Sequence, residues 1–557
     1  MFRTSFALTC AVAAALAAGT THAGSPDHTR GKSAPRVARA DASRGANAPA
    51  RTESAQQWWA DGARTAREGA ALRPKPGRAK NVILFIGDGM GLSTIAAARI
   101  REGQLRGASG EENALSFERF PYVSLSKTYS VNGQTADSAP TMTAMVTGIK
   151  TLQGVLSVDQ RVKYDNCASA KGKGVATYLE VAEALGMSTG IVSTARITHA
   201  TPAATYAHTP NRDWESDAEL TDEAKANGCR DIARQLVEFP YGNGLEVALG
   251  GGRSYFLPNT VADPEDAGAK GRRRDGRNLP VEWTQSRGDA AYVWNKAQFE
   301  AIDPKRTHHL LGLFERSHME YEQDRPRDTG KEPSLAEMTG KAIDILRNGS
   351  DKGFFLMVEG GRIDHAHHAG NASRALTDAI ALSDAVRIAT QKTSAEDTLI
   401  IVTADHSHTF TVAGYPDRGN DILGKVVTDG ALSLDANGKP YTTLGYANGP
   451  GYRGATARPD LSATDTANPD FLQEAAVPLA SETHAAEDVA IYARGPGAQA
   501  FQGTVEQNTI FHVMAQWQKD TSLFFCILAG DCGHRGRSNG VQLPLYEADL
   551  RTGLGRR

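Results

Sequence analysis

The chain has 557 residues, a formal net charge of -3, 40% hydrophobic residues and 22% charged residues. These values are ordinary for a globular protein with room for one large core or for two domains. The near balance of charge gives no support for nucleic acid as a dedicated partner.

Residues 1–23 have the features of a secretory signal peptide. Arg3 stands near the start, an apolar stretch runs from Phe6 to Ala18, and Thr21-His22-Ala23 provides a cleavage site that ends in a small residue. A membrane anchor is the less favoured alternative, because the apolar stretch is short and no stop-transfer flank follows it. We therefore expect the protein to be secreted or periplasmic.

The folded domain is expected over residues 53–535. Before it, residues 24–52 are rich in Ala, Arg, Ser and Pro, a composition typical of a disordered linker. An Ala-rich helical pattern covers 56–72 and ends before Pro74. Residues 536–557 are interpreted as a C-terminal tail.

Short apolar runs alternate with helical stretches through most of the chain, and this alternation predicts an α/β fold. We expect a large, mainly parallel central sheet with helices on both faces. The apolar runs are at 81–86, 189–194, 245–249, 354–358, 399–404 and 488–493, and the helical stretches include 335–347, 372–390 and 506–517. Residues 414–478 are rich in Gly, Pro, Thr and Asp, which indicates an inserted subdomain.

Four cysteines follow the signal segment, an even number suited to disulfides in an oxidising compartment. Four cysteines allow three pairings. The close spacing of the last two favours Cys526 with Cys532, which leaves Cys167 with Cys229. The apolar run that begins at Phe524 is too short to span a bilayer, so we expect no membrane anchor.

Residues 358–368 combine two carboxylates and three imidazoles directly after an apolar run, which suggests a metal site. If the segment after Gly361 is helical, Asp364 and His368 are four residues apart and leave the same face. Glu359 would remain at the end of the preceding strand.

Two other apolar runs also end in acids, at Asp88 and at Asp405-His406. In open α/β sheets the carboxyl ends of the strands line the ligand crevice, so these side chains can converge with Glu359. Each acid alone would be better interpreted as a helix cap or a turn residue. Three of them together favour a metal-binding crevice.

Ser138 precedes Pro140 at the start of a predicted helix. A helix cap is the simplest interpretation of a single serine there. Beside a metal site, the same position suits a nucleophile, because the positive helix end and a metal both favour its alkoxide.

Taken in order, six motifs resemble the alkaline phosphatase family, and the resemblance covers residues 56 to about 535. They are F-I-G-D-G-M-G at 85–91, T-A-D-S-A at 135–139, H-A-T-P-A-A-T-Y-A-H-T-P-N-R at 199–212, V-E-G-G-R-I-D-H-A-H-H at 358–368, T-A-D-H-S-H at 403–408 and E-T-H-A-A-E-D-V-A at 482–490.

The resemblance implies two zinc ions and one magnesium ion. One zinc would be held by Asp364, His368 and His484, and the other by Asp88, Asp405 and His406 with Ser138 alongside. Magnesium would be held by Asp88, Thr201 and Glu359, with His199 beside it. Imidazole with carboxylate suits zinc, whereas oxygen ligands suit magnesium.

The resemblance also implies hydrolysis of phosphate monoesters at alkaline pH through a phosphoserine on Ser138. Arg212 would grip two phosphate oxygens with its planar fork, although an arginine in this position could also be a surface loop charge. The pair His199 and His365 replaces the Asp and Lys of the enterobacterial form and resembles the animal enzymes.

The animal enzymes also carry a calcium site. Its positions here are Glu265, the backbone of Phe314, Glu315 and Glu332, where Glu332 replaces an Asp; solvated loop acids are the alternative. Both proposed cysteine pairings agree with the animal pattern. By the same resemblance we expect a homodimer, with 414–478 forming a crown and the helix at 56–72 embracing the partner.

Two alternative functions are a phosphodiesterase of the same superfamily and a secreted metal- or phosphate-binding protein without catalysis. A sulfatase is disfavoured because the Cys-x-Pro-x-Arg segment is absent. The run Arg272-Arg273-Arg274 is interpreted as a solvated charge run. His208 has no carboxylate at ligand spacing, so a packing or surface role is expected.

Overall fold

The structure is a computed structural model that describes residues 54–454 and 458–529. The signal peptide predicted at 1–23, the linker at 24–52 and the tail at 536–557 lie outside the described residues.

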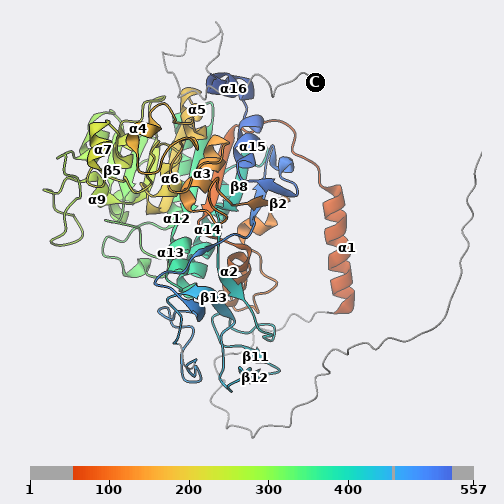
Figure 1. The fold of residues 1–557 in the computed structure, drawn as a ribbon. Coiled ribbons are helices and arrows are strands. Elements are labelled where there is room, and N and C mark those ends of the chain that lie inside the picture. Colours follow the sequence, from red (N-terminus) through yellow and green to blue (C-terminus); the bar gives the residue numbers. More distant parts are fainter. Residues whose placement is uncertain (1–53, 455–457, 530–557) are drawn as a thin grey trace, which may run out of the picture. The chain divides into compact units, whose positions relative to one another are not determined.

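A ten-stranded sheet runs through the described chain in the order β17-β2-β16-β8-β1-β7-β3-β4-β6-β5 (Figure 1). Its strands are β1 (Asn81–Gly87), β2 (Tyr122–Lys127), β3 (Ser188–Arg196), β4 (Val247–Gly251), β5 (Ala290–Val293), β6 (His309–Leu313), β7 (Phe354–Gly360), β8 (Thr398–Ala404), β16 (Val489–Arg494) and β17 (Thr504–Glu506). Strand β16 is antiparallel to β2 and β8, and the other neighbours are parallel. The predicted mainly parallel α/β sheet is confirmed.

Each face of the sheet carries its own core, because successive residues of a strand point to opposite faces. In β1, Leu84 belongs to one core and Phe85 to the other. The first core includes residues of α3 (Ser138–Thr147), α5 (Tyr178–Ala184), α15 (Thr509–Trp517) and α16 (Thr521–Ala529). The second includes residues of α2 (Leu92–Leu105), α12 (Leu335–Gly349) and α14 (Ala372–Lys392). Helices therefore cover both faces, as predicted.

Helix α12 shows how local sequence specifies these elements. The Ser334 hydroxyl accepts from the Glu337 backbone N–H at 3.2 Å, and the Glu337 carboxylate accepts from the Ser334 N–H at 2.8 Å. This reciprocal capping satisfies two backbone donors at the helix start. Leu335, Met338 and Ala342 then follow at helical spacing and are buried in the second core.

The helix predicted at 56–72 is α1 (Ala55–Ala71), and none of its residues is buried. Trp58 and Trp59 are 57% and 80% exposed. Helix α1 therefore contributes no buried residue to the cores of the described chain.

The described residues 414–454 and 458–478 contribute strands to small sheets separate from the large one (Figure 1). Strands β13 (Leu444–Gly449) and β14 (Ala475–Pro478) join β10 (Phe410–Val412) in a three-stranded sheet, and β11 (Val427–Thr428) pairs with β12 (Ala431–Leu432). The boundaries of an insertion at 414–478 stay a prediction.

Cys167 and Cys229 form the predicted disulfide, with their Cα atoms 6.0 Å apart. Cys532 lies outside the described residues, so its pairing with Cys526 stays a prediction. None of the helices in 54–454 and 458–529 has the length and apolar character needed to cross a membrane.

The interpretation of Arg272-Arg273-Arg274 as a solvated run is wrong for its middle residue. Arg273 is 0% exposed and its guanidinium contacts Asp231 at 2.9 Å and Asp275 at 2.5 Å. Burial of an arginine is tolerated here because two carboxylates pair with it. One of these carboxylates lies far away in the sequence, so the run alone could not indicate it.

Candidate active site

Three acidic residues lie at the carboxyl ends of three adjacent parallel strands. Asp88 follows β1, Glu359 is near the end of β7, and Asp405 follows β8. The sheet order β8-β1-β7 and the register, which pairs Ile86 with Glu359 and Gly87 with Ala404, bring them together. All three acids are 0% exposed. Buried carboxylates this close need protons or cations to compensate their charge.

Asp88, Asp405 and His406 form the first group that could hold a metal ion. His406 Nε2 lies 3.3 Å from Asp88 Oδ1 and 3.3 Å from Asp405 Oδ2. Burial is the main cause that raises the pKa of Asp88 well above its usual range, and repulsion from Asp405 adds to it. Burial also lowers the pKa of His406 well below its usual value, which favours the neutral form of the ring that can ligate a metal.

Ser138 faces this group from the first turn of α3. Its Oγ lies 3.3 Å from His406 Nε2 and 3.4 Å from Asp88 Oδ1. Asp137 caps the helix by accepting from the Ala139 N–H at 2.9 Å. The structure therefore brings the predicted nucleophile to the predicted metal ligands, at the positive end of a helix.

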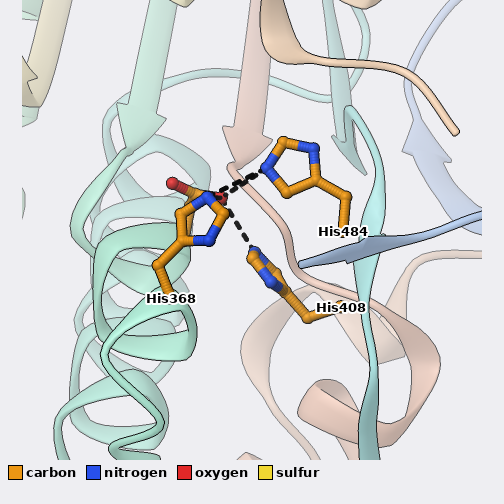
Figure 2. Close-up of side chains that lie close together, drawn as sticks. His368, His408 and His484 are labelled. Atoms are coloured by element: carbon orange, nitrogen blue, oxygen red, sulfur yellow. Dashed lines mark hydrogen bonds and ion pairs between the residues drawn. The ribbon is translucent and has the colours of Figure 1, made fainter. Parts of the chain in front are cut away.

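Asp364, His368, His408 and His484 form the second group. The first turn of α13 (Arg362–His368) places Asp364 Oδ1 3.3 Å from His368 Nε2, as the spacing predicts. His484 Nε2 lies 3.3 Å from the same oxygen. Figure 2 shows the rings of His368, His408 and His484 turned toward one point.

His408 is a member of this group that the sequence analysis did not assign. It lies in β9 (Ser407–His408), which pairs with β15 (His484–Ala485) so that His408 is opposite His484. Its Nε2 is 2.8 Å from Asp364 Oδ1, and its Nδ1 bonds Glu482. Although burial lowers its pKa, these two carboxylates raise it to about 9. With an N–H donated to each carboxylate, His408 orients Asp364. In the sequence, His408 stands two residues after the predicted ligand His406, and this spacing was the signal that could have assigned it to the site.

A third set of oxygen atoms lies next to Asp88. Asp88 Oδ2, Glu359 Oε1 and Thr201 Oγ1 are buried and have no hydrogen-bond partner among the described residues. Burial raises the pKa of Glu359 to about 7. Buried oxygens without donors, two of them from carboxylates, fit a hard divalent cation, since such a cation takes oxygen ligands.

Arg212 lies at the edge of this region, and its side chain is 18% exposed. Its Nη2 donates to His199 Nε2 at 3.1 Å, and its Nη1 is 3.7 Å from Asp137 Oδ1. Asp137 is the cap of the Ser138 helix. The guanidinium is therefore held near Ser138 while one side remains open to solvent.

A separate group of carboxylates lies in loops beyond β4 and β6. Its members are Glu265, Glu315 and Asp328. Glu332, the residue expected there, is close enough that Glu315 and Asp328 add to the effect of burial in raising its pKa to about 10. Asp328 was missed because its position depends on the path of the loop before Glu332.

Arg253, which is 0% exposed, is the cation of this loop group. Its Nη2 lies 2.8 Å from Glu265 Oε2, and its Nη1 donates to the carbonyl oxygen of Phe314 at 3.0 Å. Two of the expected ligands therefore share one buried guanidinium.

The fold and the site together define a metal-dependent enzyme of the α/β class. The family model described as alkaline phosphatase matches residues 79–519. The tissue-nonspecific alkaline phosphatase isozyme of Gallus gallus is 46% identical over 476 residues, which cover 84% of this chain and 90% of that protein. The alkaline phosphatase of Gadus morhua is 46% identical over 447 residues, covering 79% and 91%.

Solved structures agree on the fold. The structure of the Thermus thermophilus alkaline phosphatase matches with a TM-score of 0.57 and 24% identity, covering 80% of this chain and 93% of that one. The chain therefore belongs to the alkaline phosphatase family and is a phosphatase enzyme. The resemblance seen in the six motifs is confirmed.

Proposed function

We propose that this phosphatase hydrolyses phosphate monoesters to an alcohol and inorganic phosphate through a phosphoserine on Ser138. The observation that carries the proposal is the position of Ser138 Oγ, 3.3 Å and 3.4 Å from His406 and Asp88 at the start of α3. A serine is a weak nucleophile at its ordinary pKa and needs such an environment.

The donor sets support two zinc ions and one magnesium ion. Asp364, His368 and His484 would hold one zinc, and Asp88, Asp405 and His406 the other. Asp88, Thr201 and Glu359 would hold magnesium, with His199 beside it. When bound, these ions supply positive charge that favours the serine alkoxide and stabilises the attacking and leaving oxygens.

Ser138 Oγ gives its proton to solvent and attacks phosphorus, while the bond to the ester oxygen breaks on the opposite side and that oxygen takes a proton from solvent to leave as the alcohol. Water then attacks phosphorus from that side, the bond to Ser138 Oγ breaks, and Ser138 regains a proton as inorganic phosphate leaves, so phosphorus is inverted twice. Arg212 donates two N–H groups to non-bridging oxygens of the phosphate, since a guanidinium fork matches two such oxygens. Its contact with Asp137 supports this orientation.

Calcium is proposed for the loop group, through Glu265, the carbonyl oxygen of Phe314, Glu315 and Glu332, with Asp328 added from the geometry. Burial, followed by repulsion from Glu265, raises the pKa of Glu315 to about 8. A divalent cation would relieve this repulsion.

The proposal also includes that the protein is secreted and forms a homodimer. The exposed Trp58 and Trp59 of α1 support coverage of this helix by a second copy of the chain. The disulfide between Cys167 and Cys229 supports an oxidising compartment.

The test compares p-nitrophenyl phosphate hydrolysis at alkaline pH by the zinc- and magnesium-loaded wild type, Ser138→Ala and Ser394→Ala. Ser394 is an exposed serine and serves as the matched control. We expect Ser138→Ala to lose about 10³-fold or more in kcat/KM and Ser394→Ala to match the wild type.

An acid quench followed by mass spectrometry should find phosphate on Ser138 of the wild type. Equal activities of the two variants would remove Ser138 as the nucleophile. An inactive wild type that still binds metal would favour the non-catalytic binding protein, and a preference for bis-p-nitrophenyl phosphate would favour the phosphodiesterase.

A further inference from the structure

Three histidines from separate segments meet beside Arg212. His199 is the cap of α6 (Ala200–Ala203), His318 lies in the loop after β6, and His365 is in α13. Their ligand nitrogens lie within 4.8 Å of one another. Ring centroids are 4.0 Å apart for His318 and His365, and 5.3 Å and 5.5 Å from His199 to each of them. Convergence of three imidazoles is the arrangement that metal sites require.

At the alkaline pH where the enzyme is expected to work, an imidazole of ordinary pKa, about 6.5, is unprotonated. Its lone pair is then available to a metal ion.

Each ring also accepts a hydrogen bond from a guanidinium group, and a metal ion must compete with these bonds. The pairs are His199 with Arg212 at 3.1 Å, His318 with Arg196 at 2.5 Å, and His365 with Arg362 at 3.3 Å.

Each of the three arginines has a second partner. Arg196 forms two contacts of 2.7 Å and 2.8 Å with Glu215. Arg362 lies 3.6 Å from the centre of the Tyr321 ring. Arg212 is 3.7 Å from Asp137. A guanidinium that turns away from its histidine therefore keeps a favourable contact.

His199 has an unsatisfied atom in the present arrangement. Its Nδ1 is buried and lacks a hydrogen-bond partner among the described residues, whereas its Nε2 contacts Arg212. A buried ring nitrogen without a partner costs free energy that a ligand could recover.

We propose that His199, His318 and His365 form an additional metal site that binds a transition-metal ion such as Ni²⁺ or Zn²⁺. An all-imidazole set differs from the carboxylate-containing groups at the strand ends and selects nitrogen-preferring metals over magnesium. This inference rests on the proposed function only in one respect: ligation of His199 would release Arg212, the proposed phosphate ligand.

The experiment uses the full chain saturated with zinc and magnesium and then freed of excess metal. Nickel is titrated by calorimetry, and element analysis counts nickel, zinc and magnesium in the product. His318→Asn is compared with the wild type and with His512→Asn, an exposed histidine on α15 that serves as the control.

We expect the wild type and His512→Asn to take up one additional nickel ion per chain without releasing zinc. His318→Asn should bind this nickel at least about 100-fold more weakly, because losing a direct ligand costs no less than losing a contact that supports one. If zinc already fills the site, the wild type should contain one more zinc per chain than His318→Asn. His365→Gln provides a second variant should His318→Asn fail to fold.

Equal nickel and zinc content in the wild type and both variants would overturn the proposal. So would nickel uptake matched by an equal release of zinc, because the nickel would then occupy a strand-end site. A loss of inorganic phosphate affinity in His318→Asn with unchanged metal content would instead assign the cluster to anion binding. Metal content is measured without turnover, so this result is independent of Ser138.

Discussion

Among the described residues, the metal-capable groups at the strand ends and in the loops beyond β4 and β6 balance their charge differently. At the strand ends, Asp88, Glu359 and Asp405 have no hydrogen bond to a lysine or arginine within 54–454 and 458–529. In the loop group, Arg253 is fully buried against Glu265. A group with its own guanidinium keeps part of its charge balance without an ion, whereas the strand-end group depends on bound cations.

Burial widens this contrast. Asp88, Asp405 and His406 are fully buried, whereas Glu315 and Asp328 of the loop group are partly exposed. Charges in a dry site interact more strongly and are more costly to leave uncompensated. Changes at the strand ends should therefore remove catalysis, and changes in the loop group should act on stability.

The largest effect is expected for Asp405→Asn. The change removes one carboxylate from the group beside Ser138, so kcat/KM for p-nitrophenyl phosphate should fall by about 10³-fold or more. Asp384→Asn, on the surface of α14, is the control and should retain activity. Activity of Asp405→Asn within tenfold of the wild type would remove the distinction between the two groups.

Arg253→Met should give the largest loss of stability in the loop group. It leaves the carboxylates of Asp263 and Glu265 buried without their cation, so the free energy of unfolding should fall by about 3–5 kcal/mol in chelator. Urea unfolding measures this change. Arg387→Met, which breaks an exposed pair with Asp384, should cost about 1 kcal/mol or less.

Addition of calcium provides a further test of how the loop group balances its charge. Added calcium should recover part of the stability lost in Arg253→Met, because the ion compensates the same carboxylates. No calcium effect on either the wild type or Arg253→Met would argue against calcium in the loop group.

A smaller effect is expected for His408→Asn. Because His408 bridges Asp364 and Glu482, its loss should weaken zinc binding by about 10- to 100-fold while leaving every proposed ligand in place. Competition with a chelator measures the affinity, and excess zinc should restore most of the activity. Failure of excess zinc to restore activity would point to a direct role of His408 in the reaction.

The smallest effect concerns His208, a partly buried histidine that belongs to none of the metal-capable groups found among the described residues. Burial lowers its pKa, but the Glu180 carboxylate at 2.7 Å and the Ser157 carbonyl outweigh burial and raise the net value. A raised folded pKa stabilises the fold below the unfolded value of about 6.5, and this contribution is lost as pH rises through the folded pKa.

The stability difference between the wild type and His208→Gln should therefore be largest in mild acid and should shrink toward alkaline pH. Thermal unfolding at several pH values measures it. A difference that grows with pH would contradict the pairing of His208 with Glu180.

Much of the site was predictable because several of its acidic residues lie directly at the ends of strands. An apolar run followed by Asp88 or Asp405 indicates a buried strand and an acid at its carboxyl end, and parallel neighbours share that edge. The four-residue spacing of Asp364 and His368 likewise depends only on helix geometry. The positions of these residues could be predicted without knowing how the loops run.

His318, Asp328 and the burial of Arg273 were not predictable in this way. Each depends on where a long loop returns to the sheet, and the partners Arg196, Glu265 and Asp231 are far away in the sequence. The sequence around such residues has the same pattern of polar side chains whether the residue lies in a solvated loop or in a buried contact.

The sequence by itself determined the α/β class, the acids at the strand ends, the position of Ser138 at a helix start and the family, because local periodicity and ordered motifs encode them. Only the tertiary structure decided that three histidines converge beside Arg212, that His408 bridges two carboxylates and that Arg253 is buried among acids. The physical reason is that helix and strand spacing are set by near neighbours, whereas these contacts are set by chain paths that local sequence does not specify.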